Sequence, residues 1–171
     1  MEIAIRKLSE LTEIKTGKLD ANAASMDGKF PFFTCATTAL RIDVFAFDCE
    51  AVLVAGNGDL NVKYYEGRFN AYQRTYVIQS KNKSILDVKY LYYFLDSYLE
   101  TLREMSIGGV IKYIKLPYLN DAQIPLPSIS EQRRIADELS AVKKLVDKHE
   151  FAILKLKKLM EVLKHKSFDV N

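Results

Sequence analysis

Hydrophobic and polar positions follow a strand-like pattern over much of the first 80 residues. Segments rich in β-branched and aromatic residues predict strands at 30–36, 41–47, 50–56, 62–67 and 74–80. Turn residues separate these segments, including Asp48, Gly67 and the run from Gly56 to Asp59. The pattern therefore predicts a compact sheet whose strands are joined by several short loops.

Apolar residues take up a helical spacing after residue 86. They recur at intervals of four and three, as one helix face would require, at Leu91, Leu95, Tyr98, Leu102 and Met105. Asp87 is suited to cap the start of this helix, and Gly108-Gly109 would end it. We expect its aromatic residues at 90 and 92–94 to pack on the sheet rather than stack on bases.

The chain changes character at the stretch "IPLPSISEQRRIADELS", residues 124–140. Before it, residues 108–127 are expected to form a loop and a strand, because each proline disfavours helical geometry in the residue that precedes it. Pro125 and Pro127 would make the junction an extended connector. Ser128 and Glu131 then fit a capping box, so a final helix is predicted to begin here.

A heptad stripe runs along this final helix, over residues 130–167. Its members alternate spacings of four and three: Ile135, Leu139, Val142, Val146, His149, Ile153, Leu156, Met160 and Leu163. Such a helix is roughly 57 Å long at 1.5 Å per residue, whereas the preceding domain would be roughly 30–35 Å across. The domain cannot cover the whole stripe, so we expect a partner helix from a second copy or another protein. A helix folded back on its own domain, or broken into a hairpin, remains an alternative.

His149 lies within the stripe itself. It is interpreted as a polar core residue that sets the register of the helix pair, and a pH switch is the alternative reading. Altogether the patterns predict an α+β protein with two parts. A compact mixed β-sheet domain with packed helices occupies residues 1–127, and one long helix occupies residues 128–171.

Composition is that of a globular protein, with 49% hydrophobic and 27% charged residues among 171. No apolar run is long enough to cross a membrane, and the N-terminus does not resemble a secretory signal, so a cytoplasmic location is expected. The net charge is +3. Residues 1–129 carry equal numbers of acidic and basic side chains, so bulk charge alone does not indicate a nucleic-acid binder.

The sequence has no recognisable catalytic motif. The sequence contains no GxGxxG, P-loop, GxSxG or HExxH pattern, and both histidines lie in the final helix. Asp59 and Glu66 flank Lys63 in a nuclease-like manner, but such loop charges are usually solvated. Cys35 and Cys49 are interpreted as buried thiols in strands, with a metal site or disulfide as the alternative. We therefore expect a binding module with no catalysis, metal or cofactor of its own.

Four stretches, residues 8–36, 47–78, 107–127 and 124–139, together resemble a specificity subunit of a type I restriction–modification system. They include "FPFFTC", "GDLNVKYYEGRF" and the run from a proline pair into "SEQRRIADEL". Members of that family usually carry two target recognition domains and two long helices that pair antiparallel. This chain has one of each, so the resemblance implies a half-size form that restores the usual arrangement as a homodimer with an antiparallel coiled coil.

The resemblance also implies partners and a division of labour. The chain would read half of a bipartite target on double-stranded DNA and dock a methyltransferase subunit, with a restriction subunit joining through the complex. S-adenosylmethionine, ATP and Mg would be bound by those partner subunits only. Two other hypotheses are a protein-interaction adaptor that uses the coiled-coil helix, and a specificity piece of a fused restriction–methylation enzyme.

Loop residues with cationic or amide side chains are the candidates for DNA contact, since cations reach phosphates and amides reach base edges. The expected set is Lys18, Thr37, Arg41, Asn57, Asn61, Lys63, Gln73, Arg74, Lys112, Tyr113 and Lys115. Among them Lys63, Arg74 and Lys112 are expected on phosphate. Asn61 and Gln73 are expected on bases. The recognised DNA sequence does not follow from these residues, because loop geometry decides which side chain meets which base.

Overall fold

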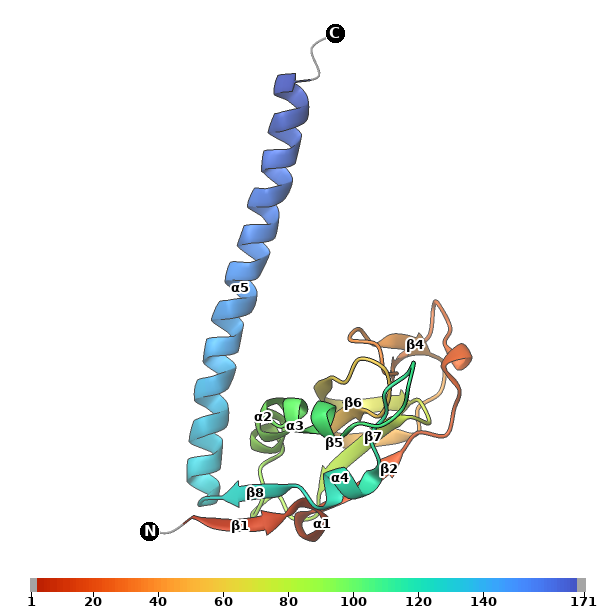
Figure 1. Cartoon of the computed structure of the whole chain (residues 1–171), viewed down its shortest axis with the longest axis vertical. Helices are drawn as coiled ribbons and strands as arrows, with labels where there is room; N and C mark the ends of the chain where they lie inside the picture. Colours follow the sequence, from red (N-terminus) through yellow and green to blue (C-terminus); the bar gives the residue numbers. More distant parts are fainter. Residues whose placement is uncertain (1–2, 169–171) are drawn as a thin grey trace. The chain divides into compact units, whose positions relative to one another are not determined.

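The computed structural model describes residues 3–168, shown in Figure 1. By their contacts the residues form two compact units, Met1–Arg133 and Arg134–Asn171. The first unit contains the sheets and the shorter helices. The second consists of most of one long helix.

A six-stranded sheet forms the centre of the first unit. Its spatial order is β2 (Thr12–Thr16), β7 (Thr75–Ser80), β5 (Phe47–Ala55), β6 (Val62–Ala71), β3 (Phe30–Phe33) and β4 (Leu40–Ile42). All neighbours are antiparallel except β3 and β6, which run parallel. The expected mixed sheet is confirmed, and β5 and β6 are longer than their sequence patterns predicted.

The strand predicted over 41–47 is wrong at residues 43–46. β4 lies at the edge of the sheet and β5 lies near its centre, so the chain must leave the edge between them. Residues 43–46 make this crossing. The side-chain amide of Asn70 donates to Val44 O at 3.1 Å, and Ala46 N donates to Phe69 O at 3.0 Å.

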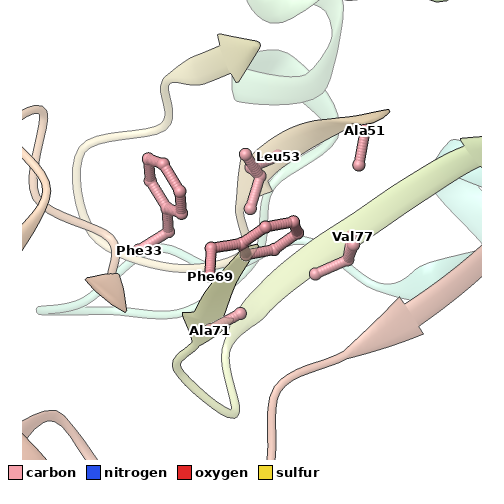
Figure 2. Close-up of a cluster of buried hydrophobic side chains, with 6 residues drawn as sticks. All are labelled: Phe33, Ala51, Leu53, Phe69, Ala71 and Val77. Atoms are coloured by element: carbon pink, nitrogen blue, oxygen red, sulfur yellow. The ribbon is translucent and has the colours of Figure 1, made fainter. Parts of the chain in front are cut away.

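Buried side chains from four strands make the core on one face of the sheet. Figure 2 shows the Phe69 ring among Phe33, Leu53 and Val77, with Ala51 and Ala71 nearby. The rings of Phe33 and Phe69 meet edge to face at 5.5 Å between centroids, a favoured geometry for aromatic pairs. The core therefore holds β3, β5, β6 and β7 together below the loops that connect them.

Two helices follow the sheet, α2 (Val88–Ser97) and α3 (Leu99–Met105), and α2 packs on β5 and β6. The expected cap is confirmed, since Asp87 Oδ1 accepts from the backbone N–H groups of Lys89 and Tyr90, each at 3.0 Å. The single helix predicted here is wrong, because it is divided at Tyr98. It also ends at Met105, where Ser106 is already extended, and so before the two glycines.

A small second sheet closes the first unit near the junction. It pairs β1 (Ala4–Lys7) with β8 (Gln123–Leu126) antiparallel, and α1 (Leu8–Leu11) and a 3₁₀ turn, η1 (Ala21–Ala23), lie between β1 and β3 in the chain. The stretch expected to lack helix contains α4 (Leu116–Asn120). Pro117 is compatible with it because the first turn of a helix needs no donor from its N–H groups.

The long final helix is confirmed as α5 (Ile129–Phe168). Glu131 N donates to Ser128 Oγ at 3.3 Å, which is the expected serine cap. The last predicted positions, 169–171, lie outside the described residues. The two compact units divide at Arg133, within α5, because the first turn of this helix is bonded into the domain.

Gln132 makes that connection and is completely buried. Its Nε2 donates to Ile85 O and to Pro127 O, and its Oε1 accepts from Asp87 N, with all three distances at 2.9 Å. One side chain thus bonds the α5 start to the proline connector and to the segment before α2.

Candidate functional site

Four loops converge on one side of the sheet, and together they form what we call the loop cluster: residues 34–38, 56–61, 72–74 and 107–115. Backbone hydrogen bonds join the last three of these loops, and the side chains of Cys35 and Asn61 connect the first loop to them. Gly58 N donates to Lys112 O at 2.9 Å, Ile114 N to Gly56 O at 2.9 Å, and Gly56 N to Arg74 O at 2.7 Å. Loops that are far apart in sequence are therefore held in a defined arrangement.

An open cleft of about 480 Å³ lies within the loop cluster, lined by Asn57, Arg74, Ile111 and Tyr113. Asn57, Arg74 and Tyr113 were singled out from the sequence. The cleft thus combines a guanidinium group, an amide and a phenol with one apolar side chain. Arginine and asparagine are the side chains best matched to guanine and adenine edges, and tyrosine adds a flat ring with a polar end.

Asn61 and Lys63 are half-buried and do not line the cleft. Asn61 Nδ2 donates to Cys35 O at 2.8 Å and to Asp59 O at 2.9 Å. Lys63 Nζ donates to Asn61 Oδ1 and to Thr34 O, and burial lowers the pKa of Lys63. These bonds join loop 34–38 to loop 56–61, so in this structure both side chains hold neighbouring loops in place. Their expected contacts with DNA stay predictions.

Gln73 and Lys18 lie at the border of the loop cluster. Gln73 N donates to Leu19 O at 2.9 Å, and its Nε2 donates to Asp20 Oδ2 at 3.4 Å. The turn at 72–74 is thereby connected to residues 17–20, and the side chains of Lys18, Gln73 and Arg74 are exposed. Lys18 and Gln73 are therefore accessible to a ligand at this border.

The other predicted contacts are more scattered. Thr37 is exposed within loop 34–38, and Lys112 and Lys115 are exposed on loop 107–115. Arg41 lies on the edge strand β4. Its guanidinium group donates to Gly28 O at 2.8 Å and to Lys29 O at 3.0 Å. The structure thus joins Arg41 to the loop before β3 and not to the loop cluster.

Sequence reasoning overlooked two residues of the loop cluster. Cys35 was interpreted as a buried strand thiol, but it is half-buried in a loop and its Sγ donates to Asn57 Oδ1 at 2.8 Å. Ile111 lines the cleft, and its apolar side chain gave no reason to choose it. The signal available was its position between a glycine pair and two cationic residues. Cys49 does lie on a strand, where burial raises its pKa.

A separate polar cluster lies on β5 and β6, where Glu50 accepts from Lys83 Nζ at 2.6 Å and from Tyr64 Oη at 2.7 Å. Burial by itself would raise the pKa of Glu50, but these two hydrogen bonds outweigh it and hold the pKa below its usual value.

Within residues 3–168, no group of three or more His, Cys, Asp or Glu side chains is arranged to hold a metal ion. In that same range, no helix is long and apolar enough to cross a lipid bilayer.

The second unit presents the heptad stripe as an exposed apolar row. From Leu139 to Leu163 its apolar members are each between 42% and 61% exposed. Phe151 and Leu154, outside the stripe, are also exposed. Helices in proteins gain most of their stability by packing an apolar face, so this row is suited to pack against another helix.

Known proteins resemble the whole chain. Residues 2–158 match the family model described as the type I restriction modification DNA specificity domain. The type I restriction enzyme EcoDI specificity subunit of Escherichia coli is 42% identical over 158 residues, covering 92% of this chain and 34% of that protein. The crystal structure of a type I restriction–modification S subunit from M. genitalium superposes with a TM-score of 0.75 at 24% identity. The superposition covers 98% of this chain and 46% of the M. genitalium chain.

A chain from a structure on complex assembly in the type I restriction–modification system has the same fold, with a TM-score of 0.72 at 19% identity. The superposition covers 95% of this chain and 44% of the other chain. This chain therefore spans about a third to just under half of the length of these relatives. The family match extends from β1 into the second half of α5. The chain belongs to the type I restriction–modification DNA specificity family.

Proposed function

We propose that this chain reads one half of a bipartite DNA target and holds a methyltransferase subunit on it. The observation that carries the proposal is the convergence of Asn57, Arg74 and Tyr113 on one open cleft, with Lys112 on the same loop as Tyr113. The three cleft residues lie on three different loops. Family membership supplies the class of ligand, and the cleft supplies donors suited to base edges.

The chemistry of the loop cluster supports sequence reading more than bulk attraction. The first 129 residues have no net charge, so non-specific attraction to the phosphate backbone would be weak. Lys112 and Lys115 lie within residues 105–120, a stretch without an acidic residue. Their charges would position the domain on phosphates, and Asn57 and Arg74 would read bases in the groove.

The α5 helix would set the distance between two such readers. Two copies whose stripes pair antiparallel about a two-fold axis would cover the exposed row from Leu139 to Leu163. Each domain would then face one half of an inverted repeat. The chain contributes recognition only. The methyltransferase subunit would supply S-adenosylmethionine and the methyl transfer, and the restriction subunit would act through the assembled complex.

Methylome sequencing of cells that carry the gene with its methyltransferase tests the reading function. We expect one methylated motif that changes or disappears when the cleft is altered by Asn57→Ala and Arg74→Ala. An unchanged motif in cells carrying both substitutions would reject the cleft as the reader.

Salt dependence of binding tests the phosphate contacts. Lys112→Ala should weaken binding to all duplexes alike and lower the slope of log affinity against log salt by about 0.9. Lys89→Ala, an exposed lysine on α2, is the matched control and should leave the slope unchanged. Equal slopes for wild type and Lys112→Ala would exclude that contact.

Analytical ultracentrifugation tests the helix pair. The wild-type chain should sediment as a dimer at micromolar concentration. Val146→Glu with Ile153→Glu should yield a monomer, because each places a charge in the covered row. Lys148→Glu puts the same side chain off the stripe and should remain dimeric. A wild-type monomer would reject pairing between copies and would favour the adaptor hypothesis, in which the stripe meets another protein.

A further inference from the structure

The loop between α3 and α4 forms a finger, residues 107–113 (Figure 1, teal). Its two ends exchange a pair of backbone hydrogen bonds, from Ile107 N to Tyr113 O at 3.0 Å and from Tyr113 N to Ile107 O at 2.9 Å. Two bonds connect the finger and the residue after it to the β5–β6 loop, from Gly58 N to Lys112 O and from Ile114 N to Gly56 O. The base of the finger is therefore fixed relative to the cleft.

Gly108 shapes the tip of the finger. Its φ is +114°, a backbone conformation that residues other than glycine rarely adopt. A Cβ at this position would lie 2.4 Å from Ile111 O. Gly109 is different, because a Cβ added to it would meet nothing within 4 Å. The turn thus requires glycine at position 108, whereas position 109 has room for a side chain.

The tip carries two β-branched apolar side chains that the domain does not cover. Val110 is fully exposed, and Ile111 is 61% exposed while also lining the cleft with Asn57 and Arg74. Neither contributes to the core, and polar residues are usual at exposed loop tips. Apolar side chains on a fixed support, at the edge of a candidate binding cleft, are suited to contact with an apolar group of the ligand.

The surroundings of the tip identify the kind of ligand. Lys112 follows Ile111 directly, Arg74 lines the cleft beside it, and the loop contains no acidic side chain. Cations and amides around an apolar tip match a DNA groove, where the phosphates are anionic and the base edges are polar. The apolar group that the major groove presents is the 5-methyl of thymine.

We propose that Val110 and Ile111 read thymine in the half-target by contact with its 5-methyl group. This inference rests on the proposed function, because it presumes that the loop cluster faces DNA. It adds the base that the tip prefers. Burial of one methyl group favours a site by about fourfold, so the tip would add selectivity at one or two positions without a hydrogen bond.

Uracil substitution tests the contact because deoxyuridine differs from thymidine only by that methyl group. Duplexes with the motif found by methylome sequencing would carry uracil at one thymine at a time, and binding would be measured with the methyltransferase complex. We expect about fourfold weaker binding at one or two positions. The Val110→Ala, Ile111→Ala double variant should bind thymine and uracil duplexes equally at those positions.

Ile85→Ala, an exposed apolar residue outside the loop cluster, is the matched control and should keep the preference for thymine. Two results would overturn the inference. In the first, uracil has no effect on binding at any position. In the second, the double variant keeps the preference for thymine. In both cases the complex still binds its motif, so the proposed function stands. Failure of the complex to bind the motif at all would instead overturn the proposed function.

Discussion

Gln132 offers a sharp test of how the long helix is joined to the domain. Gln132→Met keeps an unbranched side chain of similar size but removes every polar atom. Three backbone groups lose their partner: Ile85 O, Pro127 O and Asp87 N. Because Gln132 is completely buried, water cannot easily replace these bonds.

The magnitude follows from the number of bonds. At about 1 kcal/mol of net stability for each hydrogen bond, Gln132→Met should lower the free energy of unfolding by about 3 kcal/mol. For a chain of this size, that loss corresponds to a fall in Tm of about 6–12 °C. Gln123→Met is the matched control, because Gln123 is exposed on β8 and should change stability by less than about 0.5 kcal/mol.

Tyrosine fluorescence in a urea titration measures this loss selectively. All ten tyrosines lie between Tyr64 and Tyr118 and the chain has no tryptophan, so the signal reports on the domain and not on residues 134–168 of α5. Far-ultraviolet circular dichroism would mix the two parts. Equal unfolding free energies for Gln132→Met and Gln123→Met would refute the view that this side chain anchors the helix start.

Three further predictions concern stability of the domain. Phe69→Ala should cost about 3–5 kcal/mol in urea unfolding, because Phe69 is fully buried at the centre of the core. Gly17→Ala should destabilise strongly, because its Cβ would lie 1.7 Å from Ala71 O, whereas Gly109→Ala should leave Tm unchanged. Glu50→Gln should lower stability at neutral pH. The wild-type advantage should vanish as pH falls through the lowered pKa of Glu50, since the lowered pKa stabilises the fold only while the carboxylate is ionised. A difference between Glu50→Gln and wild type that does not change with pH would contradict this.

Local patterns in the sequence were sufficient for most of the secondary structure. Segments rich in β-branched and aromatic residues predicted the central strands, and Asp87 predicted the start of α2. The uninterrupted heptads predicted α5 almost to its ends. Predictions were wrong where the wider fold intervenes. The segment at 43–46 leaves the edge strand for the centre of the sheet, and the helical pattern across Tyr98 conceals a division into two helices.

The candidate site was predictable in composition but not in arrangement. Amides and cations in loops identified Asn57, Arg74, Lys112 and Tyr113. Their convergence depends on backbone hydrogen bonds between residues that are distant in the chain, such as Gly58 and Lys112, which no local pattern encodes. Lys63 illustrates the difference. It resembles an accessible loop cation in the sequence, and the fold bonds it to Thr34 O beneath the surface.

The periodic elements, the apolar stripe of the long helix and the resemblance to the specificity family all follow from the sequence, because spacing and residue type are local properties. Three features depend instead on the folded chain: which loops meet, the bonding of Gln132 at the start of α5, and the exposure of Val110 and Ile111 beside the cleft. The physical reason is that burial and hydrogen-bond partners depend on groups brought together from distant parts of the chain. The same side chain can therefore support the fold or face a ligand, according to what the fold places around it.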